Sequence, residues 1–103
     1  MATLLTAEQI RDALQSLPEW RQDGDAIVRD VSVAPHSQDA LESALMDVAN
    51  RANHHPDIER AGDGMRVVLS THSAGGITEK DVQLAAQIDQ VLSGAGRDTG
   101  SPD

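Results

Sequence analysis

The chain has 103 residues and is strongly acidic, with 8 Lys and Arg against 17 Asp and Glu and a formal net charge of -9. This length supports one domain with one core. The negative charge disfavours nucleic acid and anionic membranes as partners, because their phosphates attract cationic surfaces. The absence of cysteine excludes disulfides, thiolate zinc sites and thiol nucleophiles. With no targeting signal and no apolar run of membrane-spanning length, we expect a soluble, cytoplasmic protein.

The first predicted element is a helix in the segment "TAEQIRDALQSL". Thr6 and Gln9 form a capping-box pattern, and Pro18 marks the end of the helical segment. Apolar side chains recur at helical spacing at Ile10, Ala13, Leu14 and Leu17. We therefore expect one face of this helix to be buried.

A hairpin is predicted next, in "EWRQDGDAIVRDVSV", with Gly24 in its turn. The inward face of its second strand is expected to carry Ile27, Val31 and Val33. Val28 is out of phase with this alternation. For Trp20, the only aromatic residue, a place in the core or in an interface is favoured over a stacking platform.

A longer helix is predicted from about residue 39 to residue 51, with Ser37 or His36 near its cap and Pro56 just beyond its end. Its apolar stripe consists of Leu41, Ala44, Leu45, Val48, Ala49 and Ala52. The second hairpin then joins "DIER" to "MRVVLSTH" through "AGDG". Its second strand alternates clearly between apolar and polar residues, so we expect it to be the best-formed strand.

The last helix is predicted to begin at Thr78, with Ile77 and Val82 placed as a hydrophobic staple. Residues 1–92 are expected to form the domain, and residues 93–103 a flexible tail. The order helix, hairpin, helix, hairpin, helix predicts an α+β two-layer sandwich, in which three helices cover one face of a four-stranded antiparallel sheet. An aromatic-poor core and free sheet edges favour self-association.

Two adjacent histidines, His54 and His55, stand before Pro56 at the predicted junction of helix and strand. Adjacent residues in an extended segment point to opposite sides, and the pair lacks the spacing of a metal-chelating motif, so no metal site is expected. Taken alone, the pair is explained by one histidine at the helix C-terminus, where a cation is favourable, and one in solvent.

A third histidine, His72, changes this interpretation. It ends the fourth predicted strand, before a Gly-Gly turn and a helix whose first turn carries Asp81. Pairing within the second hairpin would bring His54 or His55 and His72 to the same end of the sheet. Imidazoles near a carboxylate suit proton transfer near neutral pH. Asp81 could equally satisfy the first turn of the last helix as its N3 residue.

The segments "NHHPD", "STHSAGGITEKD" and "LAAQID" together resemble the pterin-4a-carbinolamine dehydratases over roughly residues 4 to 92. The resemblance implies the α+β two-layer fold, association into homodimers or homotetramers, and removal of water from a 4a-hydroxytetrahydropterin to give the quinonoid dihydropterin. The reaction requires no cofactor and no metal. The implied partners are the pterin carbinolamine and, in some uses of the fold, another protein.

By the same resemblance, His54, His55 and His72 match the catalytic histidines. The implied substrate-binding residues are Pro56, Thr71, Ser73, Ala74 and Asp81. We expect His55 and His72 to share the acid and base roles while His54 orients the pterin.

The sequence departs from the family pattern at three places. Asn50 stands where an acidic residue is common, Ile58 stands where an aromatic is common, and the usual phenylalanines near the second helix are missing. These departures keep open an alternative, an inactive binding or assembly factor on the same scaffold, such as a transcription-factor partner or a chaperone-like factor.

Overall fold

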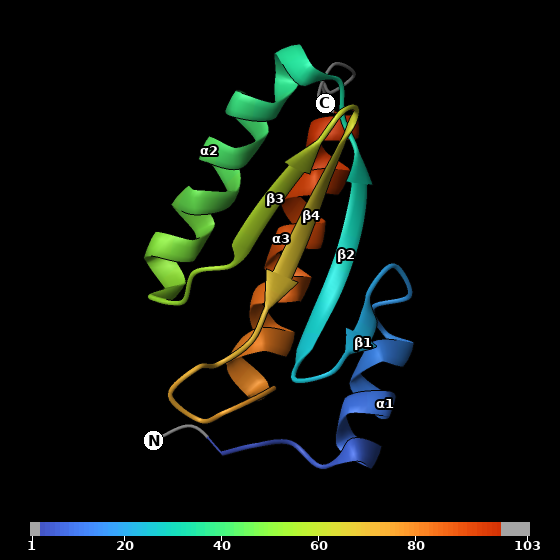
Figure 1. Ribbon diagram of the computed structural model, residues 1–103, viewed down its shortest axis with the longest axis vertical. Helices are drawn as coiled ribbons and strands as arrows, with labels where there is room; N and C mark the ends of the chain where they lie inside the picture. The colour runs from blue at the N-terminus through green and yellow to red at the C-terminus, as the bar shows by residue number, and fades with distance from the viewer. Residues whose placement is uncertain (1–2, 98–103) are drawn as a thin grey trace.

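A computed structural model describes residues 3–97 of the chain, which fold into three helices and a four-stranded sheet (Figure 1). The elements in chain order are α1 (Ala7–Gln15), β1 (Arg21–Asp23), β2 (Ala26–Ser32), α2 (Pro35–Ala52), β3 (Asp57–Ala61), β4 (Gly64–Leu69) and α3 (Glu79–Arg97). Within these residues, no helix is both long and apolar enough to span a membrane.

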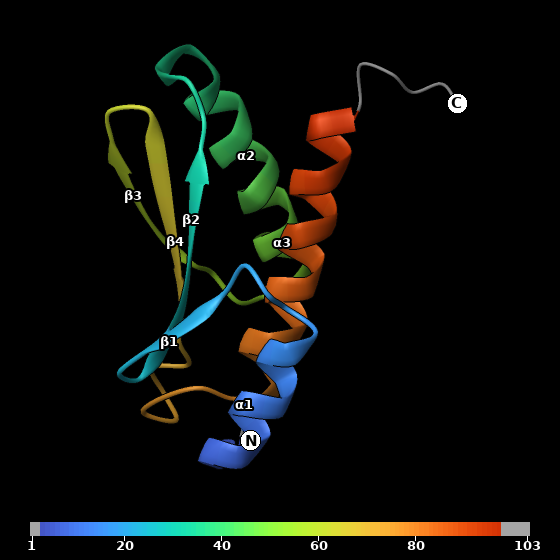
Figure 2. The same cartoon turned by 90° about the vertical axis from the view of Figure 1, so that its right-hand side faces the viewer.

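The sheet is open and antiparallel, with strand order β1-β2-β4-β3. The helices lie on one side of it and leave the other face uncovered by helix (Figure 2). The predicted fold class is therefore confirmed. β4 is a central strand: it pairs with β2 from Gly64 to Leu69 and with β3 from Gly64 to Val68. Its clear alternation of residue types matches its burial, because Met65, Val67 and Leu69 are buried and the residues between them are not.

The core lies between the sheet and the helices. Its members are mostly aliphatic: Ile10, Leu17, Trp20, Ile27, Leu45, Val48, Val67, Leu69, Ile77, Leu84, Ala85 and Ile88. Trp20 is 4% exposed, so the single aromatic residue is a core residue. The capping box predicted at Thr6 and Gln9 is also present, with both reciprocal hydrogen bonds formed.

Two predicted boundaries were wrong. The second helix begins at Pro35, about four residues earlier than expected. The proline ring fixes the backbone φ near its helical value, so Pro35 can occupy the first helical position although no side chain caps the helix. His36 and Ser37 therefore lie inside its first turn. β2 ends at Ser32, so Val33 is outside the strand, where its N–H donates to the Asp63 carbonyl over 2.8 Å.

Val28 is buried although it is out of phase with the inward residues. It is 2% exposed and lies outside the main core cluster, opposite Arg21 and Val68 in the ladder.

At the other end of the chain, α3 continues to Arg97, into the segment expected to be a tail. The remainder of that segment, residues 98–103, lies outside the described residues.

Candidate active site

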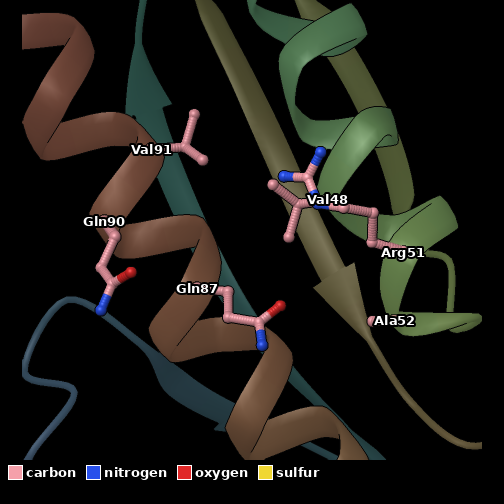
Figure 3. Close-up of a pocket in the computed structure, with 6 residues that line it drawn as sticks. All are labelled: Val48, Arg51, Ala52, Gln87, Gln90 and Val91. Carbon is pink, nitrogen blue, oxygen red and sulfur yellow. The ribbon is translucent and has the colours of Figure 1, made fainter.

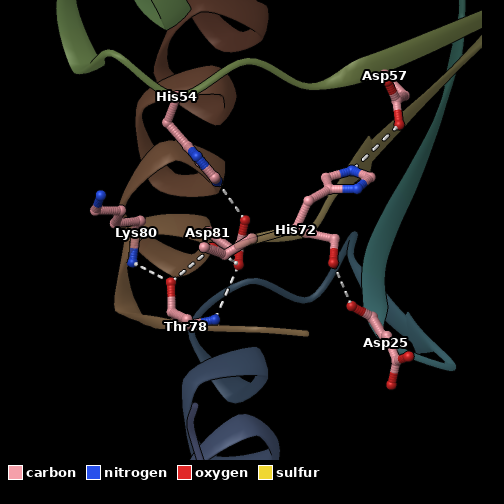
Figure 4. Close-up of polar contacts among 9 residues, drawn as sticks. Asp25, His54, Asp57, His72, Thr78, Lys80 and Asp81 are labelled. Carbon is pink, nitrogen blue, oxygen red and sulfur yellow. Dashed lines mark hydrogen bonds and ion pairs between the residues drawn. The ribbon is translucent and has the colours of Figure 1, made fainter. Parts of the chain in front are cut away.

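The carboxylate of Asp81 lies at the centre of the candidate site and is completely buried (Figure 4). Its Oδ2 atom accepts hydrogen bonds from the Thr71 hydroxyl at 2.8 Å and from the Thr78 backbone N–H at 2.9 Å. The Oδ1 atom is 2.6 Å from Nε2 of His54. Asp81 thus serves the first turn of α3, as its N3 position predicted, and also joins that turn to the histidine pair.

The two adjacent histidines have different surroundings. The His54 side chain is 13% exposed and points to Asp81, whereas His55 is exposed and its Nε2 lies 2.7 Å from Oδ1 of Asn50. The two imidazoles therefore point to different partners, Asp81 for His54 and Asn50 for His55.

Neither imidazole caps α2. The helix ends instead at Asn53, whose left-handed backbone (φ 55°, ψ 40°) places its N–H within reach of the last carbonyls, while the backbone N–H of His54 donates to the Ala49 carbonyl. Asn50 stands where the family pattern favours an acidic residue. Its amide oxygen nonetheless supplies a polar partner to His55.

His72 extends from the loop after β4 and is exposed, as His55 is. Its side chain is 84% exposed, and its Nε2 lies 4.0 Å from Oδ2 of Asp57 on β3. Antiparallel pairing of β3 with β4 brings these two segments to the same end of the sheet, as expected. The structure therefore places His54 against Asp81, but gives His55 and His72 other polar neighbours.

The five residues matched to substrate binding differ in accessibility. Pro56, Thr71 and Asp81 are buried, Ala74 is half-buried and Ser73 is exposed. Ser73 and Ala74 belong to a tight loop. The hydrogen bond from the Thr71 N–H to the Gly76 carbonyl, 2.8 Å long, joins the two ends of this loop.

Two residues of the site were missed by sequence reasoning, namely Thr78 and Asp57. The Thr78 hydroxyl lies 2.8 Å from the Thr71 hydroxyl and accepts the Lys80 N–H at 3.2 Å. Its position three residues before Asp81 was the available signal, since this is capping-box spacing. Asp57 had no comparable signal beyond its closeness in sequence to the histidine pair.

A separate groove of about 460 Å³ lies between α2 and α3 (Figure 3). It is lined by Val48, Arg51, Ala52, Gln87, Gln90 and Val91, so no histidine contributes to it. Among residues 3–97, no group of three or more His, Cys, Asp or Glu side chains is arranged to hold a metal ion.

The fold and the site define an α+β two-layer sandwich that gathers histidines and a buried carboxylate at one end of an open sheet. The chain belongs to the pterin 4 alpha carbinolamine dehydratase family, whose model matches residues 3–91.

Bacterial relatives support this membership. A protein of Nocardia farcinica, provisionally named a pterin-4-alpha-carbinolamine dehydratase, is 46% identical over 89 residues, which cover 85% of this chain and 94% of the relative. A protein of Mycobacterium sp. (strain KMS) with the same provisional name is 44% identical over 92 residues, covering 86% and 96% of the two chains.

Solved structures agree on the fold. A transcriptional coactivator/pterin dehydratase from Brucella melitensis aligns with a TM-score of 0.78 and 27% identity, over 84% of this chain and 96% of that one. A pterin dehydratase-like protein described as a RuBisCO assembly factor in the alpha-carboxysome aligns with a TM-score of 0.58 and 19% identity, over 71% and 88%. The second likeness shows the fold alone.

Proposed function

We propose that this chain dehydrates a 4a-hydroxytetrahydropterin to the quinonoid dihydropterin by histidine acid and base catalysis. The observation that carries the proposal is the grouping of His54, His55 and His72 around one end of the sheet in a chain of this family. His55 and His72 are exposed, so their rings can reach a substrate, while His54 is anchored on the buried Asp81.

The reaction needs only proton transfers. An acid protonates the hydroxyl at the carbinolamine carbon, the carbon–oxygen bond breaks and water leaves. A base then takes the proton from the adjacent ring nitrogen, and a carbon–nitrogen double bond forms. A neutral imidazole and an imidazolium can supply these two roles near neutral pH. We assign the roles jointly to His55 and His72, with His54 orienting the pterin ring.

The role of His72 is tested by the pH dependence of the dehydration rate. His72→Ala should lower the rate by about 100-fold and remove one limb of the pH profile. His36→Ala is the matched control, because His36 is exposed in the first turn of α2, away from the site. Full activity of His72→Ala with an unchanged pH profile would remove this assignment.

The alternative is a binding or assembly factor without catalysis. Asn50 at the site favours it, because an amide beside His55 cannot supply the negative charge that an acidic residue would. The two functions differ in ligand binding. A stable pterin such as 7,8-dihydrobiopterin should raise the melting temperature of a dehydratase. No shift at high pterin concentration would favour the binding factor.

A further inference from the structure

The hydroxyl groups beside Asp81 form a hydrogen-bond chain whose direction is determined by the number of available protons. Each threonine hydroxyl carries one hydrogen. Thr71 donates its hydrogen to Oδ2 of Asp81, so the contact between the two hydroxyls requires Thr78 to be the donor and Thr71 the acceptor. The Thr78 oxygen in turn accepts the Lys80 N–H. Every donor in this chain therefore points towards Asp81.

Asp81 is thereby arranged as an acceptor on both oxygens. Oδ2 receives the Thr71 hydroxyl and the Thr78 N–H, and the completely buried carboxylate has no solvent contact that could replace them. Oδ1 is then left to accept a proton from Nε2 of His54, 2.6 Å away.

The other ring nitrogen of His54, Nδ1, has no hydrogen-bond partner among residues 3–97, and the His54 side chain is 13% exposed. A proton fixed on Nε2 leaves a lone pair on Nδ1 of the neutral ring.

We propose that Asp81, held by Thr71 and Thr78, is a positioning residue that fixes His54 in its Nε2–H tautomer and presents Nδ1 as a hydrogen-bond acceptor. Asp81 then acts through His54 rather than on the substrate. This assignment rests on the proposed function. It means that Nδ1 of His54 accepts a hydrogen bond from an N–H group of the pterin ring.

The tautomer can be measured directly by ¹⁵N NMR of the histidine rings in the intact protein, at about pH 8, above the ordinary range of histidine titration. The proposal requires a protonated Nε2 and an unprotonated Nδ1 in His54 of the wild type. Either the Nδ1–H tautomer or a doubly protonated ring would overturn it. This measurement depends on neither catalysis nor any variant.

Asp81→Asn gives a sharper test, because the two donors from Thr71 and Thr78 determine the orientation of the new amide group. The two donors at Oδ2 require the amide oxygen at that position, which turns the amide NH₂ towards Nε2 of His54. His54 must then accept on Nε2 and carry its proton on Nδ1. We expect the tautomer to reverse in Asp81→Asn. An unchanged tautomer in the folded variant would refute the positioning role.

Two further variants separate local positioning from a general charge effect. Asp57→Asn removes a carboxylate near His72 and should leave the His54 tautomer unchanged. Adding Thr71→Val to Asp81→Asn removes the side-chain donor but keeps the Thr78 N–H, which still requires the amide oxygen at that position, so the reversed tautomer should persist. A return to the wild-type tautomer in the double variant would refute the part assigned to Thr78.

Binding of 7,8-dihydrobiopterin tests the link to the substrate. Reversal of the tautomer replaces an acceptor with a donor, so Asp81→Asn should weaken binding by about 10-fold or more. Reversal without loss of affinity would overturn the recognition of a pterin N–H. If the wild type neither binds nor dehydrates pterins, the proposed function fails, while the tautomer result still decides the role of Asp81.

Discussion

Replacing Asp89 with alanine should destabilise the fold by about 2–4 kcal/mol, because one carboxylate on α3 serves two partners from the first hairpin region. Its Oδ1 accepts the Trp20 indole N–H at 2.8 Å and an Arg29 guanidinium N–H at 2.6 Å. The two interactions join α3 to residues 69 and 60 positions earlier in the chain, so neither can be replaced locally.

The magnitude follows from burial. Trp20 is 4% exposed, and a buried donor that loses its acceptor costs about 1–3 kcal/mol. The Arg29 side chain is 19% exposed, so the loss of its counter-charge adds only part of the 3–5 kcal/mol seen for fully buried pairs, about 1–2 kcal/mol. Alanine recovers about 0.5 kcal/mol through its better helix propensity.

Urea unfolding followed by the fluorescence of Trp20, the only tryptophan, measures this change. Asp89→Asn is the matched control, because its amide oxygen can still accept the indole N–H while the charge is lost. It should cost less than the alanine variant. A free energy of unfolding within about 0.5 kcal/mol of wild type for Asp89→Ala would refute the assigned role of this carboxylate.

Two other predictions concern the sheet and the start of α2. The hydrogen bond from Arg66 lowers the pKa of Asp30, so Asp30 stabilises the folded state above its unfolded pKa and loses this contribution as the pH falls through the lower folded pKa. NMR titration of Arg66→Gln should show the Asp30 pKa rising towards its ordinary value, and an unmoved titration would contradict the pairing. Gln38 is buried, and its side-chain amide donates to two backbone carbonyls at 3.0 and 2.8 Å. Gln38→Ala should therefore cost about 1–3 kcal/mol in urea unfolding, whereas a neutral effect would show that water replaces both bonds.

Local signals predicted the helix ends well where a side-chain cap marks them. Thr6 and Gln9 form such a cap, and their spacing of three residues was enough to identify it. Thr78 and Asp81 have the same spacing, but the start of α3 was predicted from Ile77 and Val82, and the part of Thr78 in the cap was missed. The start of α2 was misplaced because Ala34 has no capping side chain, and the expectation relied on the polar residues that follow Pro35. Proline at the first helical position was the stronger signal.

The site was only partly predictable for a different reason. Strand order implied that His72 and the histidine pair would share one end of the sheet, and they do. Which histidine contacts Asp81 depends on the directions of side chains that are 27 residues apart in the sequence, and no local pattern encodes that choice. The burial of Val28 had the same cause, because it depends on neighbouring strands rather than on alternation within β2.

The dehydration of enzymatically generated 4a-hydroxytetrahydropterin, followed by absorbance, tests the central claim most directly. We predict that the wild-type chain accelerates this step. His55→Ala removes an exposed imidazole from the site and should lower the dehydration rate about 100-fold relative to wild type. If the wild type and the variant both show only the uncatalysed rate, the result contradicts the dehydratase function and favours the binding or assembly factor.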